Sequence, residues 1–206
     1  MNRDHWILLG GWIGFALLHS VLAAPGVKAP IQRAMGRYSR YYTLSYSGVA
    51  TISLAGILAW QYTIPSPVLG PFPILKYVAG LIAGVPGLWL MGICIRKYFF
   101  QLSGISALYG EEQRPELVIS GVHRYIRHPL YLGTLLVVWG LFLFFPLLSN
   151  LLAVVVITLY TVIGSWLEER KLLRTFGVAY EDYQRQTPML IPRLRDSWRL
   201  AIFPSR

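Results

Sequence analysis

Residues 127–170 read RHPLYLGTLLVVWGLFLFFPLLSNLLAVVVITLYTVIGSWLEER, two long apolar runs separated by a short turn. The runs cover residues 130–148 and 150–167, and each approaches the roughly 20 apolar residues that a helix needs to cross the hydrocarbon core of a membrane. The turn between them, around Pro146, carries no charged residue. The stretch therefore predicts a tight antiparallel hairpin of two membrane helices.

Three further apolar runs precede this hairpin, at residues 6–24, 44–62 and 74–99. The composition agrees with a membrane protein, because 55% of the 206 residues are hydrophobic and only 14% are charged. A soluble domain usually has about 25% charged residues. We therefore predict an all-α integral membrane protein with about five transmembrane helices.

The distribution of basic residues predicts the orientation. All lysines and arginines except Arg3 and Lys76 lie in the connections 25–43 and 96–129 or after residue 167. In a five-helix arrangement these three segments fall on the same side of the membrane. Because basic residues concentrate on the cytosolic side, we expect the C-terminus in the cytosol and the N-terminus outside.

The same distribution argues against several classes of protein. A net charge of +10 is compatible with nucleic-acid binding, but the basic residues lie between apolar runs and suit membrane lipid headgroups instead. A transporter or channel needs ionisable groups inside the spans, which are almost absent here. Cys94 is the single cysteine and the four histidines are scattered, so we predict no metal site.

Polar residues concentrate on the predicted cytosolic side, first in residues 121–133, GVHRYIRHPLYLG. Pro129 suits the first turn of a helix, so the fourth span should begin there with its free amides and positive dipole end facing the cytosol. Arg127 and His128 stand beside this helix start, which makes it suitable for a carboxylate or phosphate. Anchoring of the span at the membrane interface is an equally good interpretation of this stretch.

The second polar stretch is residues 166–183, WLEERKLLRTFGVAYEDY. Glu168 and Glu169 follow the fifth span, and neighbours on a helix point about 100° apart. One of the two can therefore face inward towards a cationic ligand while the other pairs outward with Arg170 or Lys171. The alternative is that both form outward salt bridges.

Three aromatic residues after this acidic pair predict a further helix. Phe176, Tyr180 and Tyr183 recur at helical spacing, which indicates one face of a cytosolic C-terminal amphipathic helix lying on the membrane surface. Pro188 should end this helix.

Together the two stretches resemble the signature of the isoprenylcysteine carboxyl methyltransferase family and its bacterial relatives. The first element, Arg-His-Pro-x-Tyr-x-Gly with a Gly-x-x-x-Tyr lead-in, is matched by Gly121, Tyr125, Arg127, His128, Pro129, Tyr131 and Gly133. The second, Glu-Glu-x-x-Leu with Phe-Gly-x-x-Tyr-x-x-Tyr ending in Pro, is matched by Glu168, Glu169, Leu172, Phe176, Gly177, Tyr180, Tyr183 and Pro188. The likeness covers roughly residues 90–192.

The resemblance suggests two parts, a membrane hairpin at 1–72 and a methyltransferase core at 73–206. The first part falls outside the signature, but His19 and the stretch 36–42 resemble small bacterial membrane relatives, including a methanethiol S-methyltransferase type. By analogy we expect a bacterial inner-membrane enzyme whose active site faces the cytosol.

The resemblance also implies S-adenosyl-L-methionine as the cofactor, bound between the cytosolic ends of the last two spans. His128 and the helix start at Pro129 would hold its carboxylate. Tyr131, Gly133 and one of Glu168 or Glu169 would hold its amino and ribose ends.

Two further roles follow from the same cofactor. Tyr125, Tyr131 or Trp166 would stabilise the sulfonium through its ring. Arg127 or Arg174 would orient an anionic acceptor, and these are our candidate catalytic residues.

The implied activity is methyl transfer to a lipophilic acceptor that enters from the bilayer: a prenylcysteine-like carboxylate, a small thiol or a lipid headgroup. The alternatives are a nicotinamide-dependent membrane reductase and a non-enzymatic membrane scaffold or transporter. The chain has no Gly-x-Gly-x-x-Gly motif after a strand, so a Rossmann-type cofactor site is not expected.

Overall fold

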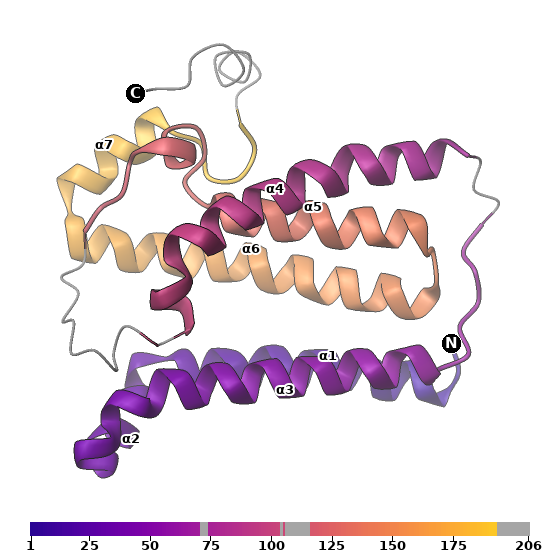
Figure 1. The fold of residues 1–206 in the computed structure, drawn as a ribbon, viewed down its shortest axis with the longest axis horizontal. Helices are drawn as coiled ribbons and strands as arrows, with labels where there is room; N and C mark the ends of the chain where they lie inside the picture. Colours follow the sequence, from indigo (N-terminus) through magenta and orange to yellow (C-terminus); the bar gives the residue numbers. More distant parts are fainter. Residues whose placement is uncertain (71–73, 104, 106–115, 193–206) are drawn as a thin grey trace.

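The computed structural model describes residues 1–70, 74–103, 105 and 116–192, and over these residues the protein is all-α (Figure 1). In chain order the helices are α1 (Arg3–Ala23), α2 (Pro25–Met35), η1 (Gly36–Tyr41), α3 (Tyr42–Thr63), α4 (Leu75–Ser103), η3 (Gly121–Arg124), α5 (Pro129–Phe144), α6 (Leu148–Phe176) and α7 (Val178–Gln186), where η marks a 3-10 helix. A bridge between Val68 and Leu147 is the one β-type contact in this part of the chain.

The prediction of an all-α chain is confirmed, and four helical segments are long and apolar enough to cross a membrane. They are α1, α4, α6 and the segment 25–63, which includes α3. The predicted fourth span corresponds to α5, which is apolar but has only 16 residues, because the chain leaves the helix at Phe145 and Pro146. The predicted fifth span is longer than expected, since α6 continues to Phe176.

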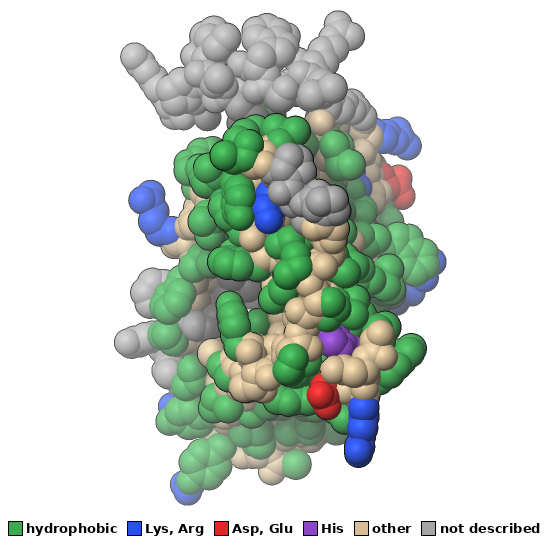
Figure 2. All heavy atoms as spheres, turned by 90° about the vertical axis from the view of Figure 1, so that its right-hand side faces the viewer, with side chains coloured by type: hydrophobic (Ala, Val, Ile, Leu, Met, Phe, Trp, Pro, Cys, Tyr) green, Lys and Arg blue, Asp and Glu red, His purple; other side chains and the backbone are tan. Residues whose placement is uncertain are grey.

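The helices form a layered bundle in which α5 packs against both α4 and α6, and α1 packs against α3 and α6 (Figure 1). α2, η3 and α7 gather at one end of this bundle. Hydrophobic and uncharged side chains cover most of the opposite end (Figure 2). Among the basic residues used to predict orientation, Arg114, Arg193, Arg195, Arg199 and Arg206 lie outside the described residues. The predicted boundary between two parts, at residues 72–73, also falls outside them.

Glycines bring α4 and α5 into close contact. A Cβ atom on Gly87 would lie 2.9 Å from the carbonyl oxygen of Gly133, and one on Gly140 would lie 3.0 Å from that of Gly80 and 3.1 Å from Cα of Gly84. These distances leave no room for a side chain, as is common where membrane helices pack through small residues. Gly133 therefore faces α4, where it sets the position of the first turns of α5.

Buried amide groups connect the first hairpin to α6 at the end of the bundle away from α7. The indole Nε1 of Trp12 donates to Oε1 of Gln61 at 2.8 Å, and Nε2 of Gln61 donates to Oδ1 of Asn150 at 2.8 Å. A buried amide without a hydrogen-bond partner destabilises the fold, so this chain of hydrogen bonds fixes how α1 and α3 pack against α6.

The predicted amphipathic helix is corrected by the structure. Gly177 adopts a φ of 55°, a conformation that favours glycine, and it ends α6. Phe176 is therefore the last residue of α6, whereas Tyr180 and Tyr183 belong to α7. Tyr180 and Tyr183 are only 1% and 9% exposed, because α7 packs against α6 and the Tyr183 hydroxyl reaches the backbone of η3. The predicted aromatic face on the membrane surface is therefore wrong: these tyrosines point into the protein.

We expect Gly140→Ala to destabilise the protein, because its Cβ atom would meet backbone atoms of α4. Overpacking of this kind costs about 1–3 kcal/mol. Gly164→Ala is the matched control, since its Cβ atom would have no neighbour within 4 Å and alanine favours helix by up to about 1 kcal/mol. Unfolding in detergent, followed by circular dichroism, compares the two. Equal stability of both variants would contradict close α4–α5 packing.

Candidate active site

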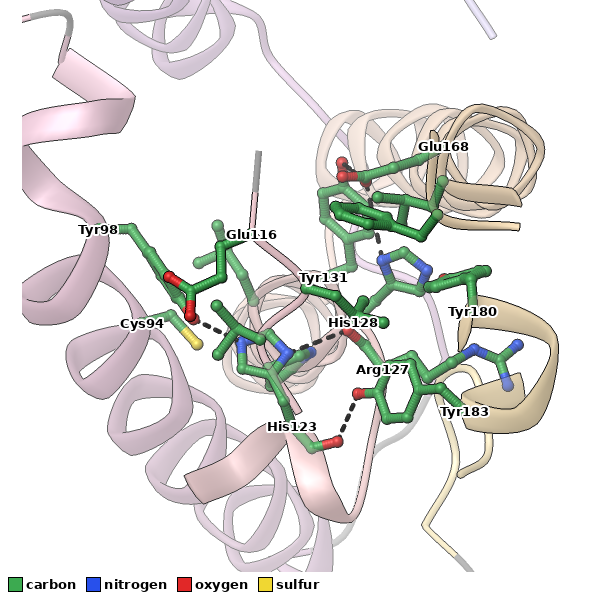
Figure 3. A pocket seen from close by; sticks show the side chains of 16 residues that line it. Cys94, Tyr98, Glu116, His123, Arg127, His128, Tyr131, Glu168, Tyr180 and Tyr183 are labelled. Atoms are coloured by element: carbon green, nitrogen blue, oxygen red, sulfur yellow. Dashed lines mark hydrogen bonds and ion pairs between the residues drawn. The ribbon is translucent and has the colours of Figure 1, made fainter. Parts of the chain in front are cut away.

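A cavity of about 250 Å³ lies at the end of the bundle where α4, α5, α6 and α7 meet (Figure 3). Its walls include Cys94 and Tyr98 of α4, Glu116, Leu117, Val118, His123 of η3, Arg127, His128 and the first turn of α5, Glu168, Leu172 and Phe176 of α6, and Tyr180 and Tyr183 of α7. The cavity therefore brings together the two polar stretches that the sequence placed on either side of the hairpin.

Arg127, which lines the cavity, forms a buried ion pair with Glu169, which lies behind the cavity wall. The two side chains are 9% and 7% exposed, and the guanidinium donates to the carboxylate from Nε at 2.9 Å and from Nη2 at 2.7 Å. Its Nη1 donates to the backbone carbonyls of Gln184, at 3.1 Å, and Thr187. The positive charge of Arg127 is therefore fully engaged by protein groups.

Glu169 joins three helices through its hydrogen bonds. Besides Arg127, it accepts from Nε2 of His128 at 2.7 Å, from the hydroxyl of Tyr180 at 2.7 Å and from the side-chain amide of Gln184. These donors come from the start of α5 and from α7, whereas Glu169 belongs to α6. Glu169 therefore holds the ends of these helices together.

The neighbouring acid, Glu168, faces the cavity. Its side chain is 42% exposed, and its Oε2 accepts a hydrogen bond from the Tyr131 hydroxyl at 2.8 Å and lies 3.7 Å from Nδ1 of His128. The His128 ring stacks on the Tyr131 ring with centroids 5.4 Å apart. The question the sequence left open is thus answered by the contacts: Glu169 binds the protein interior, and Glu168 remains accessible to a ligand.

The first turn of α5 forms part of the same wall. Pro129 occupies the first helical position, and His128 at the cap makes no side-chain hydrogen bond to the turn. Leu130 and Tyr131 of this turn line the cavity. A helix start without a side-chain cap presents amide donors and positive dipole charge, which favour an anionic group.

His123 and Tyr98 form a second polar pair on the cavity wall. Nε2 of His123 lies 3.0 Å from the Tyr98 hydroxyl, and Nδ1 lies 3.2 Å from the backbone carbonyl oxygen of Arg127. Burial lowers the pKa of the His123 imidazole below its usual value, so the ring is neutral near pH 7. Burial also raises the pKa of Tyr183 to about 12, so its hydroxyl stays protonated and donates to the His123 carbonyl.

The structure brings most, but not all, of the predicted site residues to this cavity. Arg127, His128, Pro129, Tyr131 and Glu168 line it. Four predicted residues do not line it. Tyr125 borders a separate hollow beside Gln186 and Thr187, and Gly133 faces α4. Glu169 lies behind the wall, and Arg174 is exposed on α6. Trp166 is exposed, and the guanidinium carbon of Arg170 lies 3.6 Å from the centroid of the Trp166 ring.

Sequence reasoning missed His123, Tyr98 and Gln184. His123 stands inside the quoted motif, but its partner Tyr98 comes from α4, and only the folded structure shows that the two side chains meet. Gln184 belongs to no motif, so the sequence does not distinguish it from a solvent-exposed glutamine.

Known proteins resemble this chain over the same region and beyond it. A family model described as phospholipid methyltransferase matches residues 75–179. That range contains α4, α5, α6 and most of the cavity wall, and it ends just before Tyr180. No solved structure shows significant similarity to the chain.

The alignments with curated relatives cover more of the chain than the family model does. The chain is 33% identical to methanethiol S-methyltransferase 2 of Bradyrhizobium diazoefficiens over 87% of its length and 70% of the relative. It is 29% identical to methanethiol S-methyltransferases of Pseudomonas deceptionensis, over 88% of the chain and 70% of the relative, and of Mycobacterium tuberculosis, over 86% and 74%.

We expect Glu169→Gln to cost about 3–5 kcal/mol of unfolding free energy, because it leaves the buried Arg127 guanidinium without its counter-charge. Glu168→Gln is the matched control one residue away, and its partly exposed side chain should change stability by about 1 kcal/mol or less. Denaturant titration in detergent measures both. A larger loss for Glu168→Gln than for Glu169→Gln would refute the assignment of Glu169 as the structural acid.

Stability should also depend on pH through His123. Because its pKa is lower in the folded than in the unfolded protein, its contribution is complete above the unfolded value of about 6.5 and is lost as the pH falls below that value. We expect His123→Gln to reduce the loss of stability between pH 7.5 and pH 5 relative to the wild type. Unfolding at several pH values tests this, and identical pH dependence in both proteins would show that His123 is not buried in its neutral form.

Proposed function

The chain belongs to the phospholipid methyltransferase family, and from that premise we propose that it transfers the methyl group of S-adenosyl-L-methionine to a small thiol at the cytosolic face of a membrane. The observation that carries the proposal is the cavity between the α5 helix start and the accessible carboxylate of Glu168. The names of the relatives support methyl transfer over the nicotinamide-dependent reductase and the scaffold or transporter that the sequence left open.

The groups of the cavity fit the methyl donor. S-adenosyl-L-methionine carries a carboxylate, an ammonium group and a sulfonium, and when bound it supplies an electrophilic methyl group. The amides at the start of α5 suit its carboxylate, and Glu168 suits its ammonium. Tyr131 holds Glu168 in place by donating a hydrogen bond to it.

The pairing of Arg127 also favours a cationic ligand. An unpaired guanidinium on the cavity wall would repel the sulfonium, but Glu169 compensates its charge at 2.7 Å. We therefore assign Arg127 a positioning role in place of the predicted contact with an anionic acceptor. Arg174 is exposed away from the cavity, so we no longer assign it a role in the reaction.

The rest of the cavity lining is largely apolar, which disfavours water. Leu117, Val118, Leu172 and Phe176 cover the walls between the polar groups. Exclusion of water strengthens the electrostatic interactions that hold the donor and protects it from hydrolysis. Such walls also suit a lipophilic acceptor, and among the acceptor classes we predicted, the names of the relatives favour the small thiol.

The position of the cavity at one end of the bundle suggests which side of the membrane it faces. The cavity lies where α2, η3 and α7 gather, and the connections at this end carry most of the basic residues. By the positive-inside rule we place this end in the cytosol, with membrane lipids around the bundle and the N-terminus on the other side of a bacterial inner membrane. We keep the division into a hairpin at 1–72 and a methyltransferase core at 73–206 as part of this proposal.

Binding of the donor tests the proposal. We expect the detergent-purified protein to bind S-adenosyl-L-methionine in calorimetry and to form dimethyl sulfide from methanethiol, detected by gas chromatography. Glu168→Gln should weaken donor binding about 10- to 100-fold through the loss of a charge-assisted hydrogen bond. Arg174→Gln is the control and should bind the donor like the wild type. A folded wild-type protein that binds no donor would overturn the proposed function.

A further inference from the structure

The cavity wall formed by α4 and η3 is chemically different from the wall near Glu168. Figure 3 shows Cys94, Tyr98 and His123 gathered on one side of the cavity, away from Glu168. Leu117 and Val118 also line the cavity. The carboxylate of Glu116 lies on the same side, together with a polar pair, Tyr98 and His123, that the binding of the donor does not use.

Hydrogen bonds fix the tautomer of His123. A backbone carbonyl oxygen only accepts, so the nitrogen that lies 3.2 Å from the Arg127 carbonyl, Nδ1, carries the proton of the neutral ring. Nε2 then has a free lone pair and accepts from the Tyr98 hydroxyl at 3.0 Å. A base with a fixed tautomer, oriented by a third group, is the arrangement that activates nucleophiles in many enzymes.

We infer that this pair accepts the proton of the thiol: the Tyr98 hydroxyl contacts the sulfur, and His123 is the base behind it. This inference rests on the proposed function. As the S–H bond breaks, the Tyr98 oxygen takes that proton and passes its own proton to Nε2 of His123. The thiolate sulfur forms a bond to the methyl carbon, the sulfonium carbon–sulfur bond breaks with its electron pair on the departing sulfur, and the imidazolium later releases its proton to water.

The chemistry of the acceptor explains why such a base is needed. The thiolate is the nucleophile, and an unperturbed thiol with a pKa of about 8.5 or more is mostly protonated at neutral pH. A positioned base contributes about 10²–10⁴-fold to such reactions. A carboxylate acceptor needs no base, so the pair favours a thiol over a carboxylate acceptor.

Charged and titratable groups around His123 are consistent with this role. Burial is the main reason that the pKa of His123 is low; its contact with the backbone carbonyl of Arg127 raises that pKa, and electrostatic interactions with Lys97 and His128 lower it. The ammonium of Lys97 lies over the Tyr98 ring, 5.4 Å from its centroid, where it favours an anionic sulfur nearby. Glu116 also lines the cavity, and the Tyr183 hydroxyl donates a hydrogen bond to the backbone carbonyl of His123.

Two thiols of similar size but different acidity test the inference. Ethanethiol needs a base, whereas 2,2,2-trifluoroethanethiol is far more acidic and forms thiolate by itself. We expect Tyr98→Phe and His123→Gln to lower kcat for ethanethiol by about 10²-fold or more, and for the fluorinated thiol by about threefold or less. Cys94→Ala, on the same wall, is the control and should affect both thiols equally. Equal losses for both thiols in Tyr98→Phe and His123→Gln would overturn the inference.

The pH profile and donor binding separate this inference from the proposed function. In His123→Gln, kcat/KM for ethanethiol should rise tenfold per pH unit, following ionisation of the free thiol, while the wild-type kcat/KM should level off at lower pH. S-adenosyl-L-methionine should bind both proteins with the same affinity in calorimetry. If the wild type neither binds the donor nor transfers methyl, the proposed function fails. If it does both and the two profiles coincide, only the role of His123 fails.

A spectroscopic readout is independent of activity. Nitrogen NMR of protein labelled in its histidine rings, with the His123 signals assigned by their loss in His123→Gln, reports charge and tautomer directly. At pH 7.5 we expect a neutral His123 with its proton on Nδ1. An imidazolium, or a proton on Nε2, would overturn the inference.

Discussion

The buried carboxylate of Glu169 is the constraint on which the rest of the site depends. An ionised group removed from water is stable only when other charges and donors replace its hydration. Arg127, His128, Tyr180 and Gln184 provide those donors, and they come from the start of α5 and from α7. Meeting the needs of one acid on α6 therefore brings three helix ends together and leaves Glu168, one residue earlier, at the cavity.

The rest of the fold supplies rigidity around that point. Close packing through Gly80, Gly87, Gly133 and Gly140 sets α5 against α4, and thus places Tyr98 of α4 beside the segment that carries His123. At the far end of the bundle, the hydrogen bonds among Trp12, Gln61 and Asn150 dock the first hairpin on α6. Among the described residues, no buried side-chain nitrogen or oxygen lacks a hydrogen-bond partner. Such complete pairing is what a helix bundle in lipid requires.

The sequence predicted the parts of this protein that depend on local patterns. Apolar run length located the long apolar helices, Pro129 located the start of α5, and the family resemblance implied that the two polar stretches meet at one end of the hairpin. The sequence alone did not decide which of Glu168 and Glu169 faces inward, because both orientations satisfy the helical periodicity. The helical spacing of the aromatic residues continued to Tyr183, but Gly177 ends α6 before them. Gly133 contacts α4, and the sequence could not show this because a small residue suits a helix interface and a ligand site equally well. The pairing of Tyr98 with His123 required the fold.

The central claim is that the cavity beside Glu168 binds the methyl donor. The most direct measurement is an experimental structure of the protein with S-adenosyl-L-homocysteine, the demethylated product. The account predicts density for the ligand with its carboxylate at the first turn of α5 and its ammonium at Glu168. Density in another hollow of the bundle, with this cavity left to water, would contradict it.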